Sequence, residues 1–310
     1  MALAVKPAGV SHAYACLRAL EGLIDERMNE DGGIDAATVA EVRALIGSGV
    51  GVDDGWAQVG VHPAGARRRE LYVRIAGFAR ELLGAGGAEE LFFMHKPPGL
   101  RLRFKGAPAG VVDAEVARWR RDGLVDGVEP GVYEPEERLF GGPRSMTFAH
   151  TLFTIDSLVW LDFHALSEQQ PAWLLSLAML RPVFEGLGVV GWEDIGVWDG
   201  VRRHAGRRLP EHAVAPEYVN VARSLRAVWA DPGAVVDPGV AEILEPYAGA
   251  LRAAASGWRA GYFGRRGAEL GPRAALAVHV VFHWNRGALS GGLQALLAES
   301  LAERIGDDGR

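Results

Sequence analysis

Two charged stretches in the first half of the chain carry residue types that could bind a peptide or stabilise developing charge. The first is LFFMHKPPGLRLRFKG, in which Lys96 precedes a Pro-Pro-Gly turn and Arg101 and Arg103 follow it. Alternate side chains of a strand share a face, so the two arginines lie roughly 7 Å apart on one side. Crowded cations repel each other, so this face requires carboxylates or an electron-rich ligand nearby.

The second stretch, VYEPEERLFGGPRSMTFAHTLFTIDS, contains carboxylates that could meet that need. Read as a strand over residues 129–138, its alternation places Glu134, Glu136 and Arg138 on one side. A surface hairpin with solvated charges is the simpler interpretation of either stretch alone. Two charged strands in succession, the second leading through a Gly-Gly pair into an apolar helix, favour a functional groove.

Polar residues gather again near the C-terminus, in HVVFHWNR. His279 and His283 stand four apart on an expected helix and share a face, as two metal ligands do. No third ligand is near in sequence, so we favour the polar corner of a buried helix and expect no metal. Asn285 and Arg286 extend the polar patch, and Arg286 is a candidate clamp for substrate or a carboxylate.

Other candidate groups lie inside expected helices. Asp156 follows an apolar run, and a buried carboxylate needs a partner, for which an arginine of the charged strands is the expected choice. Ser256 and Tyr262 stand six apart in AAASGWRAGYFGRRG, and six residues of an ideal helix do not share a face. Bringing both hydroxyls to one site therefore requires a distorted helix or a substrate groove that runs across the helix end.

Composition limits the class of protein. The chain has 310 residues, 49% of them hydrophobic, and a net charge of −6, with its arginine pairs scattered, which argues against nucleic-acid binding. One cysteine, Cys16, excludes an internal disulfide framework and fits a reducing cytosol. No secretory signal and no apolar stretch long enough to cross a membrane is visible, so we expect a cytoplasmic protein.

The hydrophobic pattern predicts an α+β fold. We expect a small, mainly antiparallel sheet packed with helices in the first half and a predominantly helical second half. Residues 1–50 are expected to form N-terminal helices, and residues 51–310 one domain. In the second half the predicted helices are Ser145–Leu166, Pro171–Glu185, Glu193–His204, Pro216–Ala230, Gly239–Phe263, Pro272–Ala288 and Gly292–Ile305.

These motifs together resemble the C-terminal domain of lantibiotic dehydratases. The matching segments are FFMHKPPGLRLRF, YEPEERLFGG, the Asp156-Ser157 pair and HWNR. The family carries versions of FFIRY…HLRLR, Y-x-x-E-x-x-R-Y-G-G…DS and H-M-x-x-N-R in the same order. The resemblance runs from about Trp56 to the C-terminus.

The resemblance implies one of two chemistries. The elimination domains remove glutamate from glutamylated Ser or Thr, with arginines holding the glutamyl ester. Stand-alone relatives, the pyridine synthases, join two dehydroalanines of a modified peptide by a formal 4+2 aza-cycloaddition, with loss of water and the leader peptide. Val281 occupies the position of the histidine that opens H-M-x-x-N-R, and KPPGLRLRF lacks the histidine that precedes the arginines. Both departures, with the absence of a large glutamylation domain, favour a pyridine synthase.

The pyridine synthases also imply roles for individual residues. Ser256 and Tyr262 resemble their catalytic serine and tyrosine, with His283 as a proton shuttle. The implied substrate-binding residues are Lys96, Arg101, Arg103, Glu136, Arg138, Asn285 and Arg286. The implied partner is a modified precursor peptide with its leader, and no metal, flavin or nucleotide is needed. A split elimination enzyme and a non-catalytic leader-binding module remain the alternatives.

Overall fold

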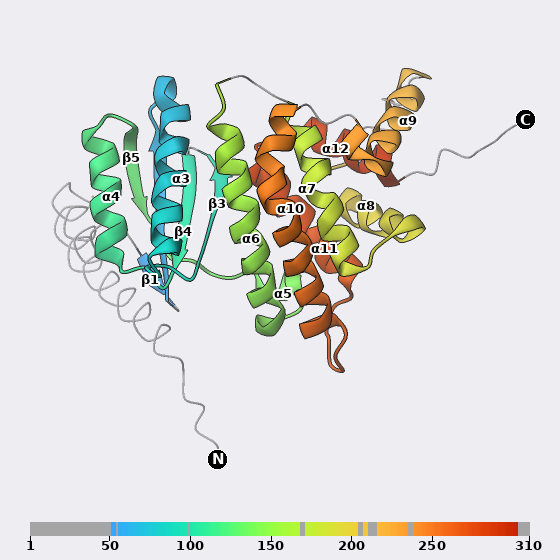
Figure 1. Ribbon diagram of the computed structural model, residues 1–310, viewed down its shortest axis with the longest axis horizontal. Coiled ribbons are helices and arrows are strands. Elements are labelled where there is room, and N and C mark those ends of the chain that lie inside the picture. The colour runs from blue at the N-terminus through green and yellow to red at the C-terminus, as the bar shows by residue number, and fades with distance from the viewer. Residues whose placement is uncertain are drawn as a thin grey trace, which may run out of the picture. The chain divides into compact units, whose positions relative to one another are not determined.

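The computed structural model describes residues 51–53, 55–97, 99–167, 171–203, 207–209, 216–234 and 238–302 (Figure 1). Its strands lie in the first half of the chain and helices dominate the second, so the predicted α+β class is confirmed. The helices expected over residues 1–50 lie outside the described residues.

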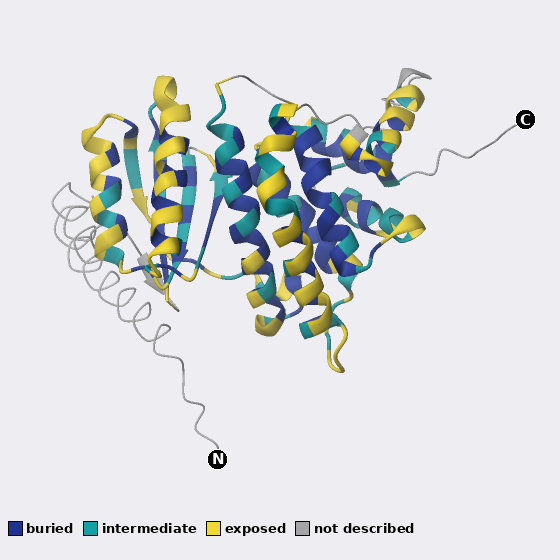
Figure 2. Ribbon diagram, viewed as in Figure 1, coloured by how far each residue is buried: buried dark blue, intermediate teal, exposed yellow. Residues whose placement is uncertain are grey.

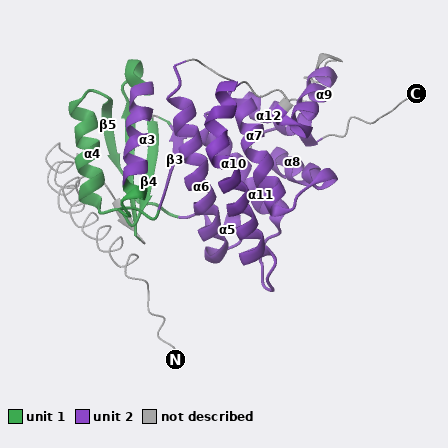
Figure 3. Ribbon diagram, in the orientation of Figure 1, with its two compact units in different colours: residues 1–68, 82–89, 97–134 green, residues 69–81, 90–96, 135–310 purple. Residues whose placement is uncertain are grey.

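The described chain divides into two compact units (Figure 3). The first contains the residues up to Arg68 together with 82–89 and 97–134. The second contains residues 69–81, 90–96 and those from Pro135 onward. The predicted domain start at residue 51 coincides with the first described residue and stays a prediction.

The first unit is built on an antiparallel sheet whose central strand is β2 (Trp56–Pro63). On one side β2 pairs with β4 (Gly99–Lys105). On the other it pairs with β1 (Gly51–Asp53) through its first residues and with β5 (Val125–Pro130) through its last. Helix α4 (Ala109–Arg121) packs against β2 and β5.

Strand alternation gives this sheet two unlike faces. Odd-numbered residues of β2 and even-numbered residues of β4 are apolar and buried: Ala57, Val59, Val61, Leu100, Leu102 and Phe104. The opposite face carries Gln58, Gly60 and His62 on β2 and the two arginines on β4. This side is polar, and it becomes less buried toward Gly60 and His62.

The second unit is organised around helix α6 (Pro143–His164), which packs against strand β3 (Glu90–Lys96) and helix α10. Helices α6 and α7 are buried along most of their length (Figure 2). Helix α11 contacts α5, α6, α7 and α8. The other helices are α3 (Arg68–Gly84), α5 (Glu137–Phe140), α7 (Ala172–Leu187), α8 (Asp194–Arg203), α9 (Pro216–Ala230), α10 (Pro238–Trp258), α11 (Pro272–Arg286) and α12 (Gly291–Ala302).

Short helical turns complete the path of the chain. Within the described ranges, three are 3-10 turns, at Gly65–Arg67, Gly191–Glu193 and Pro232–Ala234. The fourth, Arg259–Phe263, is a π-helical turn that continues α10.

The helices predicted for the second half are confirmed, with small changes at their ends. Helix α9 has the predicted bounds, and α6 begins two residues earlier than predicted, with Pro143 in its first turn. The backbone N–H groups in the first turn of a helix have no partner within the helix, so a proline there, which has no N–H, loses no hydrogen bond. Its fixed φ also suits a helix. The helix predicted to run to Phe263 is α-helical only as far as Trp258.

The predicted strand over residues 129–138 is wrong. Strand β5 ends at Pro130, and Arg138 lies in the short helix α5. Proline has no backbone donor for a sheet ladder, so Pro130 and Pro135 both oppose continued strand pairing through this segment. Glu134, Glu136 and Arg138 therefore do not share one side of a strand.

No single helix of the described chain is long and apolar enough to cross a membrane. Among the described helices, α7 taken together with Gly191–Arg203 reaches that length and composition, and this pair is bent by 113°.

We expect the close approach of β2 and β4 to make Gly99→Ala destabilising. A Cβ at residue 99 would collide with the carbonyl oxygen of Val61, so the two strands would have to separate. Overpacking of this kind costs about 1–3 kcal/mol of unfolding free energy, measurable by urea denaturation. The control is Gly110→Ala, where a Cβ meets no atom within 4 Å. Equal unfolding midpoints for both variants would contradict this packing.

Candidate functional site

A buried carboxylate on α6 is the centre of the polar network in the second unit. Oδ1 of Asp156 lies 2.6 Å from Nδ1 of His283, and its Oδ2 accepts a hydrogen bond from Nε of Arg286. Both partners lie on α11 and are fully buried. The arginine that pairs with Asp156 therefore comes from HWNR, and the expected pairing with an arginine of the charged strands is wrong.

The network keeps Asp156 ionised. Burial opposes the charged form, but the charges of His283 and Arg286 outweigh it and hold the pKa of the Asp156 carboxyl well below its usual range. The guanidinium of Arg286 also lies 4.4 Å from the ring centroid of Phe153. Arg286, predicted as a substrate clamp, is thus directed into the core rather than toward solvent.

The two histidines of α11 also face the core. Nε2 of His283 lies 2.9 Å from the hydroxyl of Ser176, which also accepts a hydrogen bond from the indole of Trp284 at 3.0 Å. His279 stacks on Phe153, and neither of its ring nitrogens has a hydrogen-bond partner among the described residues. Burial lowers the pKa of His279 to about 3, so its imidazole is neutral.

This placement matches the expected polar corner of a buried helix. Within the described residues, no group of three His, Cys, Asp or Glu side chains is arranged to hold a metal ion. His283 has no exposed surface. Its role as a proton shuttle for a peptide stays a prediction.

The C-terminal end of α11 is anchored by two further histidines. Nδ1 of His95 donates to the backbone oxygen of Asn285 at 3.0 Å, and Nε2 of His164 donates to that of Arg286 at 2.9 Å. The last carbonyls of a helix lack partners within it, so these bonds satisfy two of them. With Nδ1 of His95 protonated, its Nε2 accepts from the Tyr72 hydroxyl at 2.6 Å. The side chain of Asn285 is only half-buried.

The two arginines of β4 have different surroundings. Nε of Arg103 donates to Oε1 of Gln58 at 2.6 Å, and its guanidinium lies 4.9 Å from the ring centroid of Tyr133. Arg101 stands opposite Gly60 and is half-buried. In the part of the chain that the structure describes, its guanidinium makes no hydrogen bond or ion pair. Arg101 is therefore the arginine of this pair that is available to a ligand.

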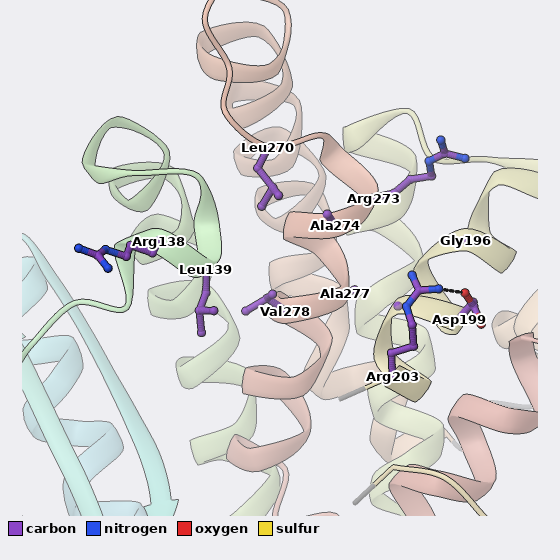
Figure 4. Close-up of a pocket in the computed structure, with 11 residues that line it drawn as sticks. Arg138, Leu139, Gly196, Asp199, Arg203, Leu270, Arg273, Ala274, Ala277 and Val278 are labelled. Atoms are coloured by element: carbon purple, nitrogen blue, oxygen red, sulfur yellow. Dashed lines mark hydrogen bonds and ion pairs between the residues drawn. The ribbon is translucent and has the colours of Figure 1, made fainter. Parts of the chain in front are cut away.

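Arg138 borders a pocket of about 630 Å³. Its other lining residues are Leu139, Gly196, Asp199, Gly200, Arg203, Leu270, Arg273, Ala274, Ala277 and Val278. Figure 4 shows Leu139 directed toward Val278, whereas the guanidinium of Arg138 points away from them, and Arg203 pairs with Asp199. The pocket thus has an apolar interior and arginines at its border.

Sequence reasoning missed the contributions of α8 and α11 to this pocket. Gly196 and Gly200 lie one turn apart on α8. A Cβ at Gly200 would lie 2.9 Å from that of Ala277, so the glycine lets the two helices approach closely. In the sequence, the two glycines at i and i+4, followed three residues later by Arg203, were the pattern that could have indicated this close helix contact.

Ser256 and Tyr262 are not brought together. A distorted helix was one of the two conditions for their meeting, and a π turn does follow α10. Ser256 is nevertheless exposed, whereas Tyr262 is buried. The Tyr262 hydroxyl donates to the carbonyl of Gly141 at 2.6 Å and accepts from the backbone N–H of Glu269 at 2.8 Å. Tyr262 therefore holds the turn that ends α5.

The remaining predicted residues lie at the surface. Lys96 is exposed at the end of β3, and Glu136 is exposed at the N-cap of α5 without a side-chain capping bond. The structure describes no hydrogen bond for either side chain, so their substrate-binding roles stay predictions.

Comparison with known proteins agrees with this architecture. A sequence model of the family described as "Lantibiotic biosynthesis dehydratase C-term" matches residues 56–303, and no curated protein matches the chain. The tRNA dependent lantibiotic dehydratase MibB from Microbispora sp. 107891 is a structural neighbour, with a TM-score of 0.55 and 19% identity. That match covers 82% of this chain and 28% of MibB. TsrL matches with a TM-score of 0.50 and 16% identity, over 79% of this chain and 93% of TsrL. These structural likenesses show the fold alone.

We expect Asp156→Asn to unfold the second unit at lower urea concentration. The substitution removes the negative charge to which the buried Arg286 guanidinium is bonded, and breaking a buried ion pair of this kind costs about 3–5 kcal/mol. Glu242→Gln, at an exposed position of α10, is the control and is expected to change stability by less than about 0.5 kcal/mol. A loss below about 1 kcal/mol for Asp156→Asn would mean that this pair is not what holds α6 against α11.

We expect His279→Phe to flatten the pH dependence of stability. The pKa of His279 is about 3 in the folded protein and about 6.5 when unfolded, so the unfolded chain binds the extra proton between these values. Stability from this group is present above pH 6.5 and falls as pH drops, by about 2 kcal/mol at pH 5. In the wild type this group makes the free energy of unfolding in urea smaller at pH 5 than at pH 8. The variant should lack that contribution. An unchanged difference would show that His279 is not a neutral buried group.

Proposed function

Because this chain belongs to the family of lantibiotic biosynthesis dehydratase C-terminal domains, we propose that it forms a pyridine-centred macrocycle in a modified precursor peptide. The family membership confirms the resemblance seen in the motifs and gives the chain a role in the biosynthesis of ribosomally made, modified peptides. The proposed reaction joins two dehydroalanines by a formal 4+2 aza-cycloaddition and then expels water and the leader.

The proposal rests on two positions of the family's motifs at which this chain has an apolar residue. Counted from Tyr133, the arginine of Y-x-x-E-x-x-R-Y-G-G falls on Leu139, one residue after Arg138. The histidine of H-M-x-x-N-R falls on Val281. Leu139 is 45% exposed and Val281 is half-buried. An apolar side chain can neither bind a glutamyl carboxylate nor remove an α-proton, so glutamate elimination is disfavoured.

The flanking imidazoles do not replace the missing histidine. His279 and His283 are fully buried, and His283 is bonded to Asp156 and Ser176. A base that removes a proton from a bound substrate must come within hydrogen-bond reach of it. Neither ring meets that condition in this conformation, which again favours cycloaddition over elimination.

The pocket beside Leu139 suits the ring-forming end of the substrate. Its volume of about 630 Å³ is in the range of small-molecule sites, and its interior is apolar, as an alkene or a pyridine ring requires. Cyclisation mainly needs the two alkenes held in contact, which is an orientation effect. Arg138 and Arg273, at the border of the pocket, are the proposed partners of peptide carbonyls.

Tyr262 is proposed to act through the turn that it holds. Gly141 has φ of 89°, a left-handed conformation, and a Cβ there would lie 2.5 Å from the Tyr262 hydroxyl. The bond to the Gly141 carbonyl fixes the end of α5 and with it Arg138 and Leu139. Direct proton donation to a peptide amide would require the hydroxyl to exchange this bond for one to substrate. Ser256, being exposed, remains a candidate for direct contact.

The deciding experiment is mass spectrometry of the purified protein incubated with a leader-bearing peptide that contains two dehydroalanines. We expect release of the leader as a carboxamide and a product with pyridine absorbance. If the peptide is unchanged while a glutamylated peptide loses glutamate, the protein is an elimination enzyme. Tight binding of the leader with no reaction on either peptide would make it a recruitment module.

We expect Leu139→Glu to lower kcat/KM for pyridine formation by about 100-fold, because it places a charge in the apolar pocket. Leu139 is already exposed, so the unfolding midpoint should stay within experimental error. The matched control is Val190→Glu, at a valine that is 54% exposed and outside this pocket. Similar activity in both variants would exclude this pocket as the site of ring formation.

A further inference from the structure

A second pocket adjoins the pocket beside Leu139, within the same unit. Its volume is about 580 Å³, and its walls come from the end of α7, the π turn and the first turn of α11. We call it the Arg259 pocket, after the cation that lines it alone. Arg273 and Ala274 line both pockets, so a peptide can extend from the first into the second past these two residues.

The guanidinium of Arg259 has a defined place in this pocket. Arg259 begins the π turn, and its guanidinium lies against the backbone of Gly188, where a Cβ would be 2.5 Å from Nη1. Gly188 caps the C-terminus of α7 with φ of 73°, a left-handed conformation that glycine adopts without strain. Within the described residues this guanidinium makes no hydrogen bond or ion pair. Glycine thus leaves room for a cation that is free to bind a ligand.

Positive charge predominates around the Arg259 pocket. The guanidiniums of Arg259 and Arg273 line it together with one carboxylate, that of Glu193. None of the three makes an ion pair in the part of the chain that the structure describes. The first turn of α11 adds backbone N–H groups that have no partner inside the helix. Leu187 and Val189 make part of the wall apolar. This composition favours an anionic group at the end of a peptide chain over a cation.

The substrate brings one anionic group whatever its side chains, which is the carboxylate at its C-terminus. In the proposed reaction the leader end of the peptide is expelled, whereas the C-terminal end stays with the ring. An anchor on the C-terminal end therefore holds the reacting part in place until the leader has left. A guanidinium can bind a carboxylate through two parallel hydrogen bonds, so Arg259 suits this end group.

Taking the proposed function as its basis, we infer that the Arg259 pocket binds the C-terminal carboxylate of the precursor peptide. Arg259 binds the carboxylate, and Arg273 binds a peptide carbonyl where the chain passes from one pocket to the other. Glu193 repels the bound group and so limits its affinity. The π turn places both Arg259 and Phe263 in this pocket, and distortions of this kind are frequent at functional sites. No bond is made or broken here.

The test is a double-mutant cycle between the C-terminus of the peptide and Arg259. Binding is measured by fluorescence anisotropy with a leader-bearing peptide in which alanine replaces both dehydroalanines, so that it is not consumed. For the wild-type protein we expect C-terminal amidation to raise Kd about 10-fold, because it removes the charge that Arg259 binds. For Arg259→Gln the acid and the amide should bind within about twofold of each other.

A second variant should change affinity in the opposite direction. Glu193→Gln should lower the Kd of the acid about threefold and leave that of the amide unchanged, because only the acid is repelled by Glu193. Weaker binding of the acid to this variant would contradict the inference. With the reactive dehydroalanine peptide, amidation should raise KM about 10-fold and keep kcat within about threefold, as for an anchor that takes no part in the chemistry.

The matched control is Arg223→Gln. Arg223 is an exposed arginine of α9 that lines neither pocket, and its side chain bonds only to that of Asn220 among the described residues. This variant should bind both peptides as the wild type does. Urea unfolding of every variant checks the fold.

The outcomes separate this inference from the proposed function. If the wild-type protein forms the pyridine but binds acid and amide equally well, the inference is overturned and the function stands. Equal losses for acid and amide in Arg259→Gln would also overturn it, because Arg259 would then contact another part of the peptide. If the cycle shows the expected coupling while the dehydroalanine peptide stays unchanged, the carboxylate site stands and the function fails. If the protein neither binds nor changes the peptide, both fail.

Discussion

The second unit depends on the buried pairing of Asp156 with Arg286 and His283 of α11. Such a pair adds little net stability relative to apolar residues of similar size, but removing one partner is costly, so it fixes how the helices meet. Because Arg286 and His283 lie one turn apart, the carboxylate can satisfy both only in one rotation of α11 about its axis. Helix α11 also lines the pocket, so the orientation of Val278 follows from that buried charge.

Four arginines of the described chain fall into two groups with different surroundings. Arg103 and Arg286 are engaged by side chains of their own unit and act as parts of the framework. Arg101 and Arg138 have no such partner among the described residues and are the ones proposed to meet substrate. Desolvating a guanidinium is expensive unless it is paired, so the burial of each arginine agrees with its use.

The sequence predicted the elements better than the site. Apolar periodicity and helix-starting prolines located α9 and α6, because local patterns determine local structure. Strand alternation placed Arg101 and Arg103 on one face, but only the tertiary neighbours Gln58 and Tyr133 distinguish them.

Three features of the structure were not predicted from the sequence. The strand expected through Arg138 failed because two prolines outweighed an apparent alternation of charges. Pairing of Asp156 with α11 links residues 130 positions apart in the chain. The distortion of the helix before Tyr262 was foreseen as a condition, but its purpose, a bond to Gly141, was not.

The π turn at Arg259–Phe263 has a consequence for comparing members of this family by residue position. A π turn closes over five residues where an α turn closes over four, so it holds one residue more than the helix around it. A relative with a regular helix here would be one residue shorter and yet superpose on both sides. After the turn, residues that contact the same neighbour in the two proteins would then differ by one in their position along the sequence. Equivalence in this region therefore follows from the neighbour that a side chain touches, and for Tyr262 that neighbour is Gly141.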